Sequence, residues 1–195
     1  MEIVLSLIKS LSLCSLLIST PLWATADIYV NGFGGWASHG QDSMLDSNTR
    51  PTGLVYGAGF GQRYNYYEFE LNASSGKLTS DIEHDGAKNT IQHEQFQATL
   101  ALNFYLLRSL YVRLGYALTS VEQSTKTPVS GASGEGLQKE YKLEDKKTDG
   151  VVIGGGWVWS ELGKMNLYLQ YDYYMLPDIK ATQHQASAGF RWYIK

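Results

Sequence analysis

The stretch N-L-Y-L-Q-Y-D-Y-Y, from Asn166 to Tyr174, alternates strictly between two kinds of side chain. One parity is apolar and aromatic, whereas the other also carries amide and carboxylate groups: Leu167, Leu169, Tyr171 and Tyr173 against Tyr168, Gln170, Asp172 and Tyr174. Successive side chains of a β-strand point to opposite faces, and a run rich in tyrosine and leucine without glycine or proline favours a strand. The stretch therefore predicts a strand in a sheet that separates a polar medium from an apolar one.

The start of the chain has the features of an export signal. An apolar stretch runs from Leu11 to Ile18, and Ala24-Thr25-Ala26 supplies the small residues that signal peptidase needs. We therefore expect residues 1–26 to be a signal peptide and residues 27–195 to form one domain. The alternative, an uncleaved anchor helix, is disfavoured because the apolar stretch is short for a bilayer.

The composition points to an exported all-β chain. There are 20 glycines and 14 tyrosines against 4 prolines, which suits crowded or tightly curved strands. Cys14, the one cysteine, lies in the expected signal peptide, so the mature domain has no disulfide. The formal net charge of -3 is too mild to indicate a nucleic-acid partner.

Alternation predicts about eight strands, at residues 27–38, 53–64, 66–75, 91–105, 109–122, 149–160, 164–176 and 181–194. Short and long connections alternate between them: 62–66, 106–109 and 161–164 are short, whereas 38–52, 76–90 and 123–148 are long. The connection 176–180 would be a short member of the long set. In an up-and-down barrel every second connection lies at the same end, so the short turns gather at one rim. We expect an eight-stranded antiparallel up-and-down transmembrane β-barrel.

A soluble lipocalin-like barrel is the alternative, because alternation alone does not say which face meets water. The length of the strands and the asymmetry of the connections favour the membrane arrangement. Aromatic residues near the strand ends are typical of a girdle at the membrane interface. The expected girdle residues are Phe104, Tyr111, Trp157, Trp159, Tyr173 and Trp192.

Five charged residues fall on the polar parity of four strands: Glu68, Glu70, Arg113, Asp172 and Arg191. An arginine facing lipid at the bilayer midplane costs about 2–4 kcal/mol, so these side chains should point into the lumen. We expect one layer of two glutamates and two arginines near the short turns, with Asp172 higher, beside Gln170. Side chains can fill the interior of an eight-stranded barrel, so ion pairs across the lumen predict that there is no open pore.

The chain resembles a known family in its signal peptide, its eight alternating strands and its last strand, A-G-F-R-W-Y-I-K. It is similar to the small outer-membrane β-barrel proteins of Gram-negative bacteria, namely the OmpA-type transmembrane domain and the OmpX/Ail group. The resemblance implies a monomer in the outer membrane, among its lipids and lipopolysaccharide. It also implies recognition of the last strand by the barrel assembly machinery, through Phe190, Trp192 and Tyr193. The match departs from the family pattern where Ile194 and Lys195 follow the aromatic residues.

No strong catalytic motif is present, and we expect no metal or cofactor. Some outer-membrane barrels modify lipid A, and the deacylase type carries a histidine and a serine two residues apart on one strand. Here His184 and Ser187 are three apart, which places them on opposite faces of a strand. The charged run from Lys139 to Lys147 suggests a solvated loop, where a host or other extracellular ligand could bind. We therefore expect a structural or adhesin-like surface role, with a lipid A-modifying enzyme and a narrow small-solute channel as alternatives.

Overall fold

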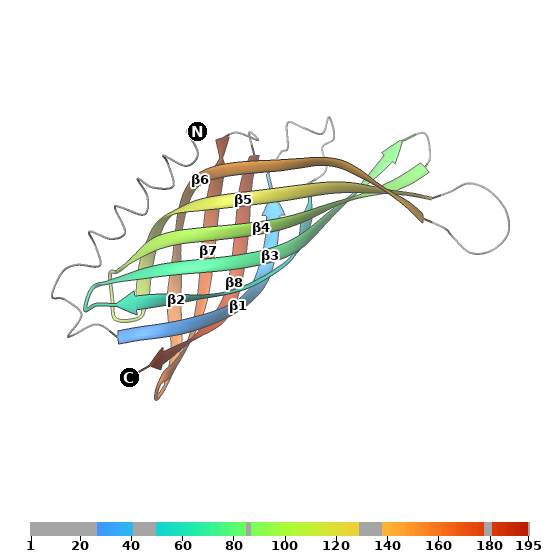
Figure 1. Cartoon of the computed structure of the whole chain (residues 1–195). Helices are drawn as coiled ribbons and strands as arrows, with labels where there is room; N and C mark the ends of the chain where they lie inside the picture. The colour runs from blue at the N-terminus through green and yellow to red at the C-terminus, as the bar shows by residue number, and fades with distance from the viewer. Residues whose placement is uncertain (1–26, 41–49, 85–86, 129–137, 178–180, 195) are drawn as a thin grey trace.

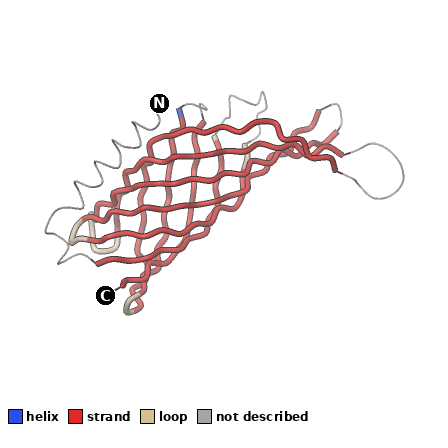
Figure 2. The backbone as a smooth tube through the Cα atoms, viewed as in Figure 1, coloured by secondary structure: helices blue, strands red, loops and turns tan. Residues whose placement is uncertain are grey.

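The structure is a computed structural model that describes residues 27–40, 50–84, 87–128, 138–177 and 181–194. Eight strands form a closed barrel, in which each strand pairs antiparallel with the next and β1 pairs with β8 (Figure 1 and Figure 2). Their bounds are β1 Asp27–His39, β2 Thr52–Arg63, β3 Tyr67–His84, β4 Ala87–Tyr105, β5 Leu110–Pro128, β6 Gln138–Leu162, β7 Met165–Leu176 and β8 Ala181–Ile194. The expected all-β up-and-down barrel is confirmed.

The start of the chain and the helices of the structure bear on other ways to cross a membrane. The signal peptide expected at residues 1–26 lies outside the described residues. Within the described ranges, no helix is long and apolar enough to cross a membrane.

Strand β7 carries the alternation expected from its sequence. Leu169 and Tyr171 are 44% and 50% exposed on the outside of the barrel, whereas Gln170 and Asp172 are 8% and 1% exposed on the inside. The same division holds around the barrel, where large apolar side chains cover the outer surface and the buried interior is rich in amide and charged groups. A soluble barrel would have the opposite arrangement, so the lipocalin-like alternative is wrong and the apolar face is the one that meets lipid.

The lipid-facing band is narrow. On β4 it runs from Phe96 to Phe104 and on β5 from Leu110 to Leu118, nine residues on each strand. A transmembrane β-strand needs about 9–11 residues, so this band is at the lower limit of that range. At the end with the long connections, charged groups follow: Lys77 on β3 lies 3.3 Å from Glu94 on β4, and both side chains are more than half exposed.

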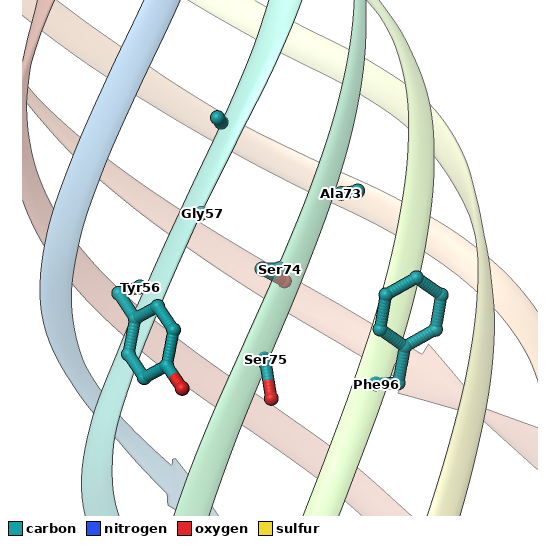
Figure 3. Close-up of a pocket in the computed structure, with 7 residues that line it drawn as sticks. Tyr56, Gly57, Ala73, Ser74, Ser75 and Phe96 are labelled. Atoms are coloured by element: carbon teal, nitrogen blue, oxygen red, sulfur yellow. The ribbon is translucent and has the colours of Figure 1, made fainter.

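Small residues make the lipid-facing surface uneven over β2, β3 and β4. Tyr56 on β2 and Phe96 on β4 stand on either side of Ala73 and Ser75 on β3 (Figure 3). The depression between the two aromatic rings has a volume of about 340 Å³. It opens onto the bilayer, so lipid chains would fill it.

Two of the expected long loops are instead paired strands. The hairpin β3–β4 stays in register as far as His84 and Ala87, and the hairpin β5–β6 as far as Pro128 and Gln138, with one irregularity after Gln123. The expected loops 76–90 and 123–148 are therefore wrong, and the charged run 139–147 lies in β6 rather than in a loop. Apolar alternation ends where the strands leave the bilayer, but backbone pairing continues in water, where neither face needs to be apolar.

Two interior positions are glycines, because tyrosine rings occupy the space that a larger side chain would need. A Cβ atom at Gly156 on β6 would overlap the Tyr111 ring, and one at Gly61 on β2 would overlap the Tyr29 ring. Both tyrosines are buried, so their rings have little room to move away. These glycines therefore make space for aromatic side chains that fill the narrow lumen.

Gly156→Ala should destabilise the barrel by about 1–3 kcal/mol, because the added methyl group overpacks a filled interior. Gly34→Ala is the matched control, since a Cβ atom there meets nothing closer than 4.0 Å. Urea unfolding in lipid vesicles measures both variants. Equal stability of Gly156→Ala and Gly34→Ala would show that the lumen is not filled at Tyr111.

Candidate functional site in the barrel lumen

Strand parity brings the five expected charged residues together inside the barrel. They come from β3, β5, β7 and β8, and none is more than 3% exposed: Glu68, Glu70, Arg113, Asp172 and Arg191. All five belong to one set of contacts, which we call the lumen ion network. Buried charges are tolerated only when they are paired and hydrogen-bonded, so each contact matters for stability.

Glu70 lies at the centre of the lumen ion network. Its Oε1 atom is 2.6 Å from Nη1 of Arg113, and its Oε2 atom is 3.3 Å from Nη2 of Arg191. The hydroxyl of Tyr29 donates to Oε2 at 2.9 Å, and the amide of Asn72 donates to Oε1 at 2.6 Å. One carboxylate thus accepts from two guanidinium groups on different strands and joins β3 to β5 and β8.

Glu68 lies two residues along the same face of β3 and has its own partners. Nη2 of Arg191 lies 3.0 Å from Glu68 Oε1, so Arg191 bridges both glutamates. The amide of Asn103 donates to Oε1 at 2.7 Å, and the hydroxyl of Tyr105 donates to Oε2 at 2.9 Å. Both carboxylate oxygens of Glu68 are therefore satisfied within the barrel wall.

Asp172 joins the same network. Its Oδ1 atom lies 3.5 Å from Nε of Arg113, and its Oδ2 atom accepts a hydrogen bond of 2.7 Å from the amide of Gln170. Gln170 is the neighbour that the sequence predicted. Asp172 was expected to lie apart from the layer of glutamates and arginines, and that expectation is wrong. Arg113 on β5 and Asp172 on β7 both pair with Gly154 on the intervening β6, which has no side chain to keep them apart.

Arg63 is a member of this region that the sequence interpretation missed. It pairs in register with Glu68 at the end of β2, and its guanidinium lies 4.3 Å over the Tyr105 ring. Its Nη1 atom also donates to the hydroxyl of Tyr193 at 3.2 Å. The lumen ion network holds three carboxylates and two guanidinium groups, so Arg63 supplies the remaining positive charge nearby.

Tyrosines surround the network, and one of them corrects an expectation. Tyr111 was expected in the lipid-facing girdle, but it is 1% exposed and its hydroxyl donates to Gln170 Oε1 at 2.8 Å inside the lumen. It shares the parity of Arg113 on β5, and that parity is the signal that could have placed it correctly. The Arg191 guanidinium lies over three inward-facing rings, at 4.5 Å from Tyr168, 5.0 Å from Tyr111 and 5.5 Å from Tyr29.

The other girdle candidates lie on the outside of the barrel. Phe104, Trp157 and Trp192 are each 44–49% exposed, and Trp159 is 67% exposed. These four lie near the short turns, whereas Tyr173 is half-buried against the ring of His184 nearer the other rim. We propose that these outer aromatic side chains lie at the membrane–water interface, where aromatic residues are enriched.

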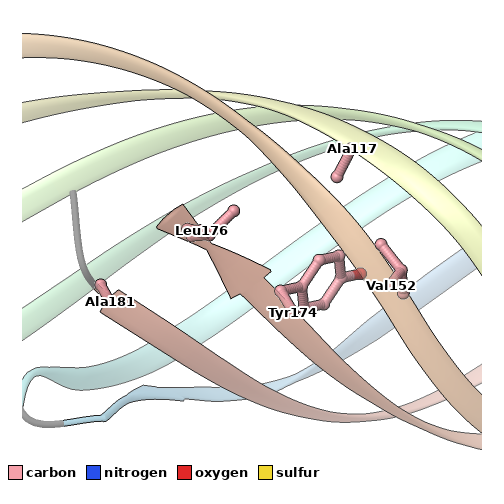
Figure 4. Packing of buried hydrophobic residues seen from close by; sticks show 5 residues of the cluster. All are labelled: Ala117, Val152, Tyr174, Leu176 and Ala181. Carbon is pink, nitrogen blue, oxygen red and sulfur yellow. The ribbon is translucent and has the colours of Figure 1, made fainter. Parts of the chain in front are cut away.

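Side chains also occupy the lumen between the network and the long-connection rim. An apolar cluster from β5, β6, β7 and β8 lies there: Ala117, Val152, Tyr174, Leu176 and Ala181 (Figure 4). Nearby, the amide of Gln97 donates to the hydroxyl of Thr119 at 3.0 Å, and a ring nitrogen of His39 lies 3.1 Å from the side-chain oxygen of Gln95. Polar and apolar side chains thus both occupy the lumen beyond the lumen ion network.

The strand-eight histidine and serine do not form a catalytic pair. His184 lies on the outside, with its Nδ1 atom 2.5 Å from the hydroxyl of Tyr171, whereas Ser187 is buried inside. Opposite faces are what their spacing predicted. Among the described residues, no three histidine, cysteine, aspartate or glutamate side chains are grouped to hold a metal ion.

No family model matches the chain, and no curated protein matches it. Among solved structures, Neisserial surface protein A is 15% identical, with 87% of this chain and 99% of that chain covered and a TM-score of 0.52. The outer membrane protein OprG from Pseudomonas aeruginosa is 12% identical, with 87% and 96% covered and a TM-score of 0.52. The chain has the fold of the small outer-membrane β-barrels. Ail, the attachment invasion locus protein of Yersinia pestis, is 14% identical, with 86% and 99% covered and a TM-score of 0.47.

Arg113→Ala should destabilise the barrel by roughly 3–5 kcal/mol, because it leaves Glu70 and Asp172 buried with less compensation. Lys77→Ala breaks an ion pair whose side chains are 53% and 58% exposed, and this control should cost no more than about 1 kcal/mol. The stability of both variants is measured by unfolding in urea, with the gel shift between unheated and heated samples as the readout. Similar midpoints for the two variants would contradict a stabilising lumen ion network.

The filled lumen also predicts the electrical behaviour of the protein. In planar bilayers the intact barrel should show little or no steady conductance, because the interior of an eight-stranded barrel is only wide enough for the side chains that occupy it. Arg113→Ala should raise the leak by opening a gap beside Glu70. A large and stable conductance from the unaltered chain would contradict the plugged lumen.

Proposed function

We propose that the protein is a monomeric outer-membrane barrel with a closed lumen, which holds a projecting β-sheet outside the cell for contact with a surface partner. The main support is that β3, β4, β5 and β6 continue past the lipid-facing band while their neighbours stop. On β5 the strand continues for ten residues beyond Leu118, as far as Pro128, which corresponds to roughly 33 Å of extended chain. A small barrel has no need of such a sheet for its own closure.

The projecting sheet has two strand edges available for pairing. The last pair of β2 with β3 is Thr52 with Thr79, so β3 residues 80–84 continue beyond β2. The first pair of β6 with β7 is Val151 with Met175, so β6 residues 138–150 pair with β5 alone among the described residues. An extended segment of a partner can add to such an edge through backbone hydrogen bonds.

The contacts inside the lumen support the proposed surface role, because they argue against the channel alternative. Transport through the barrel would require Glu70, Arg113 and Arg191 to separate, and each is buried with partners at 2.6–3.3 Å. Rigid barrels that expose binding segments at one end suit recognition rather than passage. The barrel is then a membrane-embedded support for the projecting sheet.

The remaining partners follow from the outer surface. Lipids and lipopolysaccharide would contact the apolar band, and we propose that the barrel assembly machinery recognises β8. Phe190 and Trp192 alternate on the outer face of β8 and are 44% and 48% exposed. Neither interaction requires a cofactor or a metal ion.

Shortening the two long hairpins tests the role of the projecting sheet. Residues 80–91 and 121–146 are each replaced by Asn-Gly, which joins the paired residues Thr79 with Gln92 and Ser120 with Lys147 by two-residue turns. The shortened barrel should still fold and show its gel shift on heating. Cells that display it should lose attachment to cultured cell monolayers and immobilised matrix proteins.

A matched control replaces residues 41–49, which connect β1 to β2, with a Gly-Ser linker of the same length. This variant keeps the projecting sheet, so attachment should be retained. Attachment that survives hairpin shortening, or that disappears only in the linker variant, would refute the proposed role of the sheet.

The proposal includes the absence of lipid-modifying catalysis, and that part has its own test. Purified protein in vesicles that contain lipopolysaccharide should neither release nor transfer acyl chains, because His184 and Ser187 lie on opposite faces of β8. Mass spectrometry of the lipid A fraction measures this. Loss or gain of an acyl chain would establish an enzyme, and the proposed function would then be wrong.

A further inference from the structure

The turn between β4 and β5 exposes two leucines at its start, followed by an exposed Arg108. Leu106 and Leu107 are 61% and 65% exposed at consecutive positions. Beside them, Tyr66 in the turn between β2 and β3 is 76% exposed. The two turns are joined, because the backbone N–H of Tyr105 donates to the carbonyl of Tyr66 at 2.8 Å. The three exposed side chains therefore lie on two hydrogen-bonded turns of one rim, and we call these three side chains the patch.

The backbone of this turn is already hydrogen-bonded within the protein. The N–H groups of Leu106 and Leu107 both donate to the carbonyl of Leu110, at 2.9 and 3.2 Å. The carbonyl of Ser109 accepts from the N–H of Val158 at 2.7 Å. A segment that enters a bilayer must satisfy its backbone polar groups internally, and this turn meets that condition for these groups.

The patch is continuous with the lipid-facing surface. Phe104, Leu110 and Trp157 lie on the outer face just above the turn and are 41–49% exposed. The nine residues of the β4 band rise only about 20 Å at a strand tilt of about 40°, whereas the apolar band of an outer-membrane barrel is about 25 Å tall. Adding Leu106 and Leu107 supplies roughly the missing height.

We propose that the β4–β5 turn, with Tyr66 beside it, is an interfacial anchor that enters the periplasmic leaflet of the bilayer. Its binding partner is the boundary between the headgroups and acyl chains of that leaflet. β4 and β5 are also the two central strands of the projecting sheet, so the anchor lies at the opposite end of strands that extend into that sheet. It holds that side of the barrel at a fixed depth beneath the sheet.

Site-directed spin labelling measures the depth of the turn directly. Cys14→Ser removes the chain's one cysteine, and single labels are then attached through Leu107→Cys, Leu114→Cys or Lys164→Cys. Leu114 lies in the middle of the lipid-facing band, and Lys164 lies in the β6–β7 turn. Collision rates with oxygen, which concentrates in lipid, and with a nickel chelate, which stays in water, are compared in phosphatidylethanolamine–phosphatidylglycerol vesicles.

The label at Leu107→Cys should have an oxygen-to-nickel ratio several-fold above that at Lys164→Cys and below that at Leu114→Cys, as expected for a position at the boundary of the headgroups and acyl chains. A ratio equal to that at Lys164→Cys would place the turn in water and overturn the anchor. Protection from both probes would indicate a protein contact in place of lipid, which would overturn it as well. Neither outcome bears on attachment through the projecting sheet, so the two proposals fail separately.

A second variant tests whether the anchor sets the depth of the rim. Leu106→Asn combined with Leu107→Asn should leave the gel shift on heating intact and make a label at Leu110→Cys several-fold more accessible to the nickel chelate. Leu162→Asn changes a similarly exposed leucine, at 55%, which is the last residue of β6 before the β6–β7 turn; this matched control should leave that label unchanged. No change at Leu110 in the double variant would show that the leucines do not fix the depth of the barrel.

Discussion

The Glu70 carboxylate, held between the guanidinium groups of Arg113 and Arg191, is the interaction on which the rest of the barrel depends. Lipid covers the outside, so the charged residues of the spanning strands have to face inward. Eight strands leave too little room for bulk water, so those charges must find partners among themselves. The hydroxyl of Tyr29 and the amide of Asn72 complete the set around Glu70, at 2.9 and 2.6 Å. The fold therefore places polar groups where a soluble protein would place its apolar core.

Much of this arrangement follows from sequence periodicity. Parity along the strands was enough to predict the barrel, the apolar outer face and the inward direction of Glu68, Arg113 and Asp172, because each rule depends only on neighbouring residues. Tyr111 was assigned to the girdle because tyrosine is common both at membrane interfaces and inside narrow barrels. Its shared parity with Arg113 was the better guide, because residues of the same parity on one strand all face the same side of the sheet.

Other features could not be read from periodicity because they depend on the stagger of the strands. The contact of Arg113 with Asp172 arises across β6, where Gly154 leaves room between them. Arg63 contacts Tyr105 and Tyr193 beside the network, from a strand end that the sequence interpretation also assigned to a turn. The long hairpins were mistaken for loops because strands in water lose their apolar alternation while their backbone pairing continues to Pro128 and Gln138.

The two ends of the central strands β4 and β5 differ in the medium they meet. At one end they continue beyond the bilayer with β3 and β6, and edge positions on β3 and β6 lack a neighbouring strand within the described part of the chain. At the other end an apolar turn prolongs the lipid-facing surface through Leu106 and Leu107. The filled lumen between them makes the barrel a rigid connection. In the two proposals, this connection joins the projecting sheet to an anchor in the opposite leaflet.

A double-mutant cycle on Glu70 and Arg113 measures the central interaction most directly, with Glu70→Gln, Arg113→Met and the combined variant unfolded in lipid vesicles. Because the two groups are 2.6 Å apart and fully buried, the interaction free energy should be at least about 2 kcal/mol. The combined variant should then lose much less unfolding free energy than the sum of the losses in the two single variants. An interaction free energy below about 0.5 kcal/mol, the value for independent sites, would contradict an ion network that holds the lumen closed.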